Sequence, residues 1–91
     1  MPKRKKAESA SSDAQRAHRA EELIRQATET IYDAMKKKAV TKAELARRLG
    51  RTNAYVSQIL SRNRNLTLRT LADVALALEV NPRIVLSDKS R

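Results

Sequence analysis

Most of the ionisable side chains in this chain, which are the ones that could bind a ligand or take part in catalysis, are cationic. Of its 91 residues, 20 are Lys or Arg and 10 are Asp or Glu, for a net charge of +10, with one His and no Cys. Without cysteine the chain has no thiolate zinc site and no disulfide framework, and one histidine leaves little for acid–base or metal chemistry. The single Gly excludes a glycine-rich phosphate-binding loop. We therefore expect no enzyme activity, no metal and no cofactor, but an acidic partner, for which nucleic acid is the first candidate.

The positive charge lies in two segments. Residues 1–20 carry six cations and two anions, and residues 39–70 carry seven cations and one anion. Residues 21–38 and residues 71–91 each carry equal numbers of both signs. This pattern favours localised contacts with an acidic partner over a charge spread evenly for solubility.

The N-terminal segment begins with a basic run formed by Lys3, Arg4, Lys5 and Lys6. Residues 1–12 have no periodic apolar face and cannot bury enough surface to offset their ordering. We therefore predict a disordered basic arm over residues 1–18. It is either a solvated, charged tail or an arm that follows DNA phosphates or enters a minor groove.

Helical periodicity begins after the arm. Between about residues 19 and 38, apolar residues recur at helical spacing, and Lys36, Lys37 and Lys38 suit a helix C-terminus. A second helix is predicted over 42–49, where Thr41 and Glu44 form a capping box and Gly50 ends the helix. The apolar residues of the first helix are Leu23, Ile24, Ala27, Ile31, Ala34 and Met35.

Two further threonines cap later helices. Thr52 precedes a helix over about 53–61, which directs Val56, Ile59 and Leu60 inward. Thr67 precedes a helix over about 68–78. The residues expected to face inward from that helix are Leu68, Leu71, Ala72, Ala75 and Leu78.

The end of the chain predicts a fifth helix. Asn81 and Pro82 resemble an N-cap followed by proline at the first helical position, ahead of Ile84, Val85 and Leu86. The prediction is thus an all-α domain over residues 19–88, followed by a short tail over 89–91. No apolar run is long enough to span a membrane and no secretory signal is visible, so we expect a cytoplasmic protein associated with the nucleoid.

Two short helices joined at Gly50 predict a helix-turn-helix. Ala46 is small enough for the two helices to cross closely, and Val56, ten residues later, anchors the second helix to the first. Residues 41–80 resemble the Cro/C1-type (XRE-like) helix-turn-helix family of phage repressors, bacterial regulators and antitoxins, and the resemblance extends loosely over 20–88. It implies a compact five-helix lambda-repressor-like domain that binds double-stranded DNA.

The resemblance also implies roles for individual residues, with the helix over 53–61 in the major groove. The residues matching base-contacting positions are Asn53, Ala54, Ser57 and Gln58. The residues matching DNA-backbone positions are Lys42, Arg51, Thr52, Tyr55, Ser61, Arg62 and Arg64.

Three positions depart from the family pattern. Lys42 replaces a common glutamine, Arg51 replaces an apolar residue, and Arg62 or Asn63 occupies a position that is often glycine.

Several side chains have a plainer interpretation. Tyr55 has the alternative of packing against the helix over 42–49. Arg47, Arg48 and Arg69 are each expected on a solvated face, and His18 is expected to be inert.

One monomer would read about four or five base pairs, which is too few to select a site in a genome. Proteins of the family that this chain resembles bind palindromic sites as dimers. We therefore expect Ile84, Val85 and Leu86 to form a dimer contact, with closure of the monomer core as the alternative. The resulting hypothesis is a sequence-specific regulator, a repressor of an operator; the alternative is an antitoxin or adaptor that binds a partner protein such as a toxin.

Overall fold

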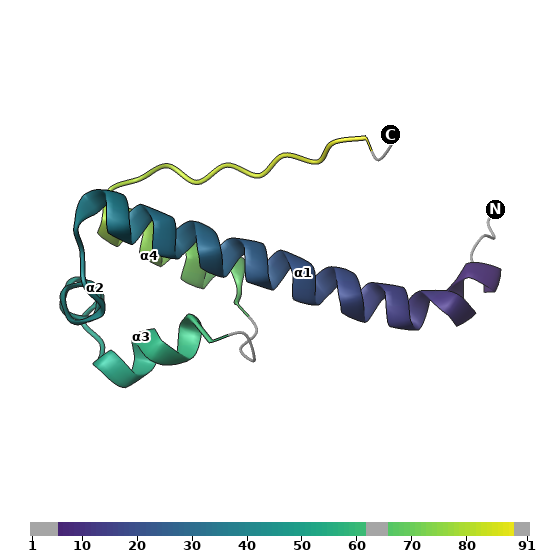
Figure 1. The fold of residues 1–91 in the computed structure, drawn as a ribbon, viewed down its shortest axis with the longest axis horizontal. Helices are drawn as coiled ribbons and strands as arrows, with labels where there is room; N and C mark the ends of the chain where they lie inside the picture. The colour runs from purple at the N-terminus through teal and green to yellow at the C-terminus, as the bar shows by residue number, and fades with distance from the viewer. Residues whose placement is uncertain (1–5, 62–65, 89–91) are drawn as a thin grey trace.

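The structure, a computed structural model, describes residues 6–61 and 66–88, with the side chains of residues 13–61 and 66–88. These residues form four α-helices and no strand: α1 (Lys6–Lys38), α2 (Lys42–Leu49), α3 (Asn53–Ile59) and α4 (Leu68–Leu78). α4 packs along the C-terminal half of α1, α2 contacts α3 and α4, and the N-terminal half of α1 extends away from the other helices (Figure 1). The all-helical class is confirmed, but the described residues hold four helices where five were expected.

α1 begins earlier than the sequence pattern predicted. It starts at Lys6 rather than near residue 19, so the expectation of disorder is wrong for residues 6–18. The side chains of residues 13–20 are all exposed, and the first buried side chain described along α1 is that of Thr28. The early part of α1 is thus a helix that packs on nothing else in the described chain.

Pairs along its own surface stabilise this exposed part of α1. Arg16 Nη2 lies 2.6 Å from Asp13 Oδ1, and His18 Nε2 lies 3.5 Å from Glu22 Oε1, a contact that is an ion pair only when the imidazole is protonated. One turn on, Arg25 binds carboxylates on both sides of it along the helix. Such i,i+3 and i,i+4 pairs each add a few tenths of a kcal/mol, about 0.2–0.5, to a helix without tertiary packing.

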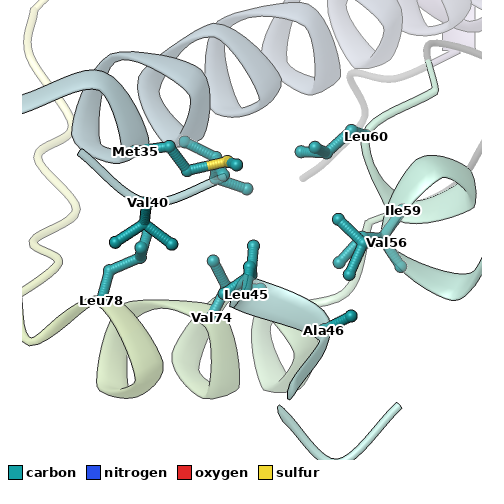
Figure 2. Close-up of a cluster of buried hydrophobic side chains, with 10 residues drawn as sticks. Met35, Val40, Leu45, Ala46, Val56, Ile59, Leu60, Val74 and Leu78 are labelled. Atoms are coloured by element: carbon teal, nitrogen blue, oxygen red, sulfur yellow. The ribbon is translucent and has the colours of Figure 1, made fainter. Parts of the chain in front are cut away.

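The hydrophobic core lies where the four helices meet (Figure 2). Leu45 of α2, Val56 of α3 and Leu78 of α4 are almost completely buried. Leu23 of α1 lies outside the core and is exposed, because it precedes the part of α1 that the other helices cover. The buried cluster consists of Ile31, Met35, Val40, Leu45, Ala46, Val56, Ile59, Leu60, Val74 and Leu78.

The predicted start of each short helix is confirmed. The side-chain oxygens of Thr41, Thr52 and Thr67 accept hydrogen bonds of 3.0–3.1 Å from the backbone N–H three residues later. The bounds of α2 and α4 agree with the prediction, whereas α3 ends at Ile59 rather than near residue 61.

The prediction that two residues of α4 face inward is wrong. Leu68 and Ala72 are exposed, and Val74 is buried in their place. Leu71 is half-buried, and Val74, Ala75 and Leu78 are buried. These four residues follow helical spacing, so they form the face of α4 that packs on the core.

The predicted fifth helix is absent. Residues 80–88 form no helix, and Ile84, Val85 and Leu86 are exposed, which also excludes closure of the monomer core by these three side chains. Three consecutive apolar residues do not make one helical face, so this segment has no stripe to lay against the core. Across the described part of the chain, no helix has the length and apolar character needed to cross a membrane.

Candidate nucleic-acid interface

α2 and α3 are joined by a turn at Gly50, as predicted. Gly50 has φ 68° and ψ 33°, the left-handed conformation that glycine adopts without strain. Its N–H donates to the Arg47 carbonyl at 3.1 Å, and the Arg51 N–H donates to the Ala46 carbonyl at 2.9 Å, which together form a Schellman motif. The buried methyl of Ala46 lets the helices approach closely, and Val56 anchors α3, so α2 and α3 form a helix-turn-helix.

α3 presents one polar face to solvent. The buried side chains of Val56 and Ile59 hold its other face against the core. The exposed face has an amide near each end and only small side chains between them, so nothing bulky blocks a surface that approaches α3. The four residues predicted to contact bases all lie on this exposed face: Asn53, Ala54, Ser57 and Gln58.

The turn brings Arg51 and Tyr55 together. The Arg51 guanidinium lies 4.1 Å from the centroid of the Tyr55 ring, within cation–π range. The ring is half-buried and packs against the hydrophobic core. The Tyr55 ring therefore packs on the core, and it supports the Arg51 cation beside the start of α3.

Two other residues predicted to contact the DNA backbone lie near the starts of α2 and α3. Lys42 is exposed at the start of α2, and its Nζ lies 6.0 Å from the centroid of the Tyr32 ring. Thr52 is exposed, but its Oγ1 accepts a hydrogen bond from the Tyr55 N–H, so its first role is to cap α3.

The remaining predicted contacts are only partly described. Ser61 is half-buried just after α3. Arg62 and Arg64, like Lys3, Arg4 and Lys5 of the arm, lie outside the described residues, and Lys6 is described only as the first residue of α1.

Arginine side chains neutralise the only acidic residue of the 39–70 segment. Glu44 Oε2 accepts a hydrogen bond from Arg48 Nε at 3.0 Å, and the Arg47 guanidinium also binds the Glu44 carboxylate. The hydrogen bonds from Arg47 and then Arg48 lower the pKa of Glu44 below its ordinary value. This carboxylate therefore stays ionised and paired, and does not stand free to repel an anionic ligand.

One expectation about this cluster is wrong, and one contact in it was not foreseen. Glu44 was expected to complete the capping box by accepting from the Thr41 N–H, but among the described residues its carboxylate binds Arg47 and Arg48 instead. Arg48 is exposed, as expected, and its Nη1 also donates to the Ala77 carbonyl of α4 at 2.9 Å. Sequence reasoning missed this contact because 29 residues separate the partners and no local spacing signals it.

Comparison with known proteins agrees with this geometry. A family model described as helix-turn-helix matches residues 31–85, more than half of the chain. The match begins at the first core residue of α1 and spans α2, α3 and α4. No curated protein and no solved structure matches the chain significantly.

Proposed function

Because the chain belongs to the XRE/Cro/C1-type helix-turn-helix family of DNA-binding regulators, we propose that it is a sequence-specific regulator of transcription. It binds double-stranded DNA with α3 in the major groove. The observation that carries this proposal is the exposed face of α3, which has two amides and small residues on a helix anchored by Val56 and Ile59. An α-helix with such a face can enter the major groove without a steric barrier.

The base contacts follow from the chemistry of this face. Asn53 and Gln58 each offer an amide that can pair with N6 and N7 of an adenine, and Ala54 can contact a thymine methyl. Ser57 lies between them and can donate to or accept from either kind of base edge.

The DNA backbone is held by the cations and hydroxyls around α3. Arg51, supported by the Tyr55 ring, and Lys42 at the start of α2 approach phosphates on either side of the groove. Such contacts fix the orientation of the domain without reading sequence. The other residues that we assign to the backbone are Thr52, Ser61, Arg62 and Arg64.

We further propose that two copies bind a palindromic operator and repress the gene that it controls. The exposed apolar run Ile84–Val85–Leu86 supports a dimer contact, because none of these three side chains is buried against the described part of the monomer. Two domains reading half-sites about one helical turn apart supply the specificity that one domain lacks.

Selection of bound duplexes from a random pool tests the proposal. The wild-type chain is expected to enrich a palindromic sequence. Asn53→Ala with Gln58→Ala removes both amides and is expected to lose about 1–3 kcal/mol of discrimination for each pairing. Arg64→Ala is expected to weaken binding to all duplexes alike. If the double variant enriches the same sequence as the wild type, the assigned readout by α3 is wrong.

A second candidate function is that of an antitoxin or adaptor. The observation that favours it is the exposed stretch of α1 over residues 13–20, which extends from the core and presents a helical surface to a protein partner. The test is co-expression with the product of an adjacent toxin-sized reading frame. A stable complex, lost when Arg16 and Arg19 are replaced by Glu, would support this function, and failure of the two proteins to co-purify would remove it.

A further inference from the structure

The surface between the α2–α3 turn and α4 is hollowed by a pocket of about 600 Å³, which we call the turn groove. Leu49 of α2 and Val74 and Ala77 of α4 give it an apolar lining. Arg51 lines it from the turn, and Asp73 lines it from α4. The groove therefore has apolar and charged side chains together in its lining, a mixture that is also found on surfaces that bind another polypeptide.

Two features of the groove lack a partner. Asp73 is exposed, and among the described residues it makes no ion pair. Leu76, also in the lining, is 79% exposed. The cations of the lining, by contrast, are engaged, since Arg48 binds Glu44 and Ala77 and Arg51 lies over Tyr55. The groove thus offers an unpaired carboxylate next to an uncovered leucine.

The C-terminal segment over residues 83–88 has the complementary pattern. Ile84, Val85 and Leu86 are 67%, 72% and 95% exposed, so nothing in the described chain covers them. Arg83 precedes this apolar run and Asp88 follows it. In an extended segment alternate side chains point the same way, so Ile84 and Leu86 can face one surface together.

We propose that the turn groove of one copy of the chain binds the C-terminal segment of a second copy, and that the exchange is reciprocal. Arg83 of one copy pairs with Asp73 of the other, while Ile84 and Leu86 cover Leu76 and enter the groove. The charge pattern and the two uncovered apolar surfaces favour this occupant. The inference rests on the proposed dimer and names the surface to which its contact segment binds.

The dimensions of segment and groove agree. Along α4 the groove runs from Thr70 to Ala77, a rise of about 10 Å at the helical repeat. Three extended residues span about 10 Å, the length of the apolar run. The chain does not fill its own groove. Residues 80–88 run on from the C-terminal end of α4 as an extended segment, and residues 81–88 are exposed (Figure 1). Reciprocal exchange would use both tails and both grooves and close the assembly at two copies.

Charge reversal across the contact tests the inference with full-length chains. Asp73→Arg sets two cations against each other, and Arg83→Asp sets two anions against each other. Each variant alone is expected to raise the Kd for dimerisation about fivefold or more, measured by sedimentation equilibrium. The double variant is expected to dimerise like the wild type. Circular dichroism checks that each variant is folded, and Asp73→Asn serves as a milder variant.

Mixing the two single variants gives the sharper result. In a mixed dimer, the groove of the Asp73→Arg chain receives the tail of the Arg83→Asp chain, so the two introduced charges are opposite. The other groove keeps the original Asp73 against the original Arg83. Equal amounts of the two weak homodimers are therefore expected to form a heterodimer with wild-type affinity. Recovery in the double variant without recovery on mixing would show that each tail binds its own chain, and would overturn the inference.

Apolar variants separate this inference from the proposed dimer itself. Leu76→Ala and Leu86→Ala are each expected to weaken dimerisation about tenfold or more, whereas Leu23→Ala, exposed on α1, is expected to have no effect. If Leu86→Ala weakens the dimer while Leu76→Ala and Asp73→Arg do not, the tail binds elsewhere; the groove is then wrong and the proposed dimer stands. A chain that remains monomeric even on a palindromic duplex would overturn both.

Discussion

The Nη1 atom of Arg48, in the last turn of α2, donates a hydrogen bond of 2.9 Å to the carbonyl oxygen of Ala77, in the last turn of α4. The last four carbonyls of a helix lack partners within it. In α4, the N–H groups of Glu79 and Val80 satisfy those of Leu76 and Ala75, which leaves the Ala77 oxygen for Arg48. One side chain therefore caps α4 and fixes its position relative to the helix-turn-helix.

We expect Arg48→Ala to lower the free energy of unfolding by about 1 kcal/mol, because it removes a charge-assisted hydrogen bond between two helices. A loss of this size lowers the melting temperature of so small a domain by about 4–8 °C. Arg47→Ala is the matched control, since Arg47 also binds Glu44 but is exposed, and its loss is expected to destabilise less than the loss of Arg48. Equal losses in the two variants, measured by urea unfolding, would mean that the contact with Ala77 contributes nothing.

Glu44 makes stability depend on pH in a predictable direction. Its pKa is lowered in the folded chain by the hydrogen bonds from Arg47 and Arg48, so the unfolded chain binds a proton more readily as pH falls. The stability that Glu44 contributes is therefore complete above the ordinary glutamate pKa of about 4.3 and is lost as pH falls through the lower folded value.

We expect the wild type to be more stable than Glu44→Gln at pH 7, and the difference to disappear on acidification below that range. Urea unfolding of both chains at a series of pH values measures this difference. A gap that stays constant from neutral to acid pH would show that the two ion pairs do not stabilise the fold.

Three helices end in the same hydrogen-bond pattern, but only one of them ends with glycine. Ala39 after α1 and Glu79 after α4 have φ of 56° and 60°, in the left-handed region that Gly50 occupies after α2. At each end the residue that follows donates to a carbonyl five residues back, as in a Schellman motif. For side chains with a Cβ this conformation costs about 1–2 kcal/mol.

Replacing Ala39 or Glu79 with glycine is therefore expected to stabilise the fold, and replacing Gly50 with another residue is expected to destabilise it. Ala39→Gly and Glu79→Gly should each raise the free energy of unfolding by about 0.5–1 kcal/mol. Gly50→Ala should lower it by about 1 kcal/mol through backbone strain alone, since an added Cβ meets no atom within 4 Å. Ala43→Gly, on the exposed face of α2, is the control and should destabilise by about 0.5–1 kcal/mol. A loss on Ala39→Gly would contradict this account.

The sequence predicted well those features that local chemistry decides. Thr41, Thr52, Thr67 and Gly50 mark helix ends because capping depends on a residue and its neighbours within one turn. Arg48 and Tyr55 were less predictable, since their partners come from tertiary packing of α2, α3 and α4. The exposed face of α3 followed from the buried face, whose spacing was visible.

The two ends of the chain were predicted poorly, for different physical reasons. Residues 6–18 lack an apolar stripe, and the spacing of Asp13 with Arg16 and of His18 with Glu22 was the overlooked signal for a helix. Residues 81–86 carry helix-start residues, but capping chemistry does not form a helix that has no surface to bury against.

The last prediction concerns the basic run Lys3–Lys6. Lys6, the last residue of the run, begins α1, and from Lys6 to Thr28, the first buried residue described along it, the helix rises about 33 Å. If the run contacts phosphates, replacing all four residues with Ala should reduce the slope of log K against log salt by up to about 3–4 and leave the selected sequence unchanged. Fluorescence anisotropy on an enriched duplex and on a random duplex, over a range of salt, measures this slope.

The control for this prediction removes charge from the same helix without touching the run. Arg16→Ala with Arg19→Ala takes away two exposed cations of α1 and is expected to leave the slope nearly unchanged, since these cations are not proposed to bind phosphate. The slope of log K against log salt could instead fall by the same amount per removed charge in this control and in the variant that lacks the run. That result would mean that the basic run acts only through net charge. The run would then be a solvated tail, and DNA recognition would rest on α3 and its surrounding cations alone.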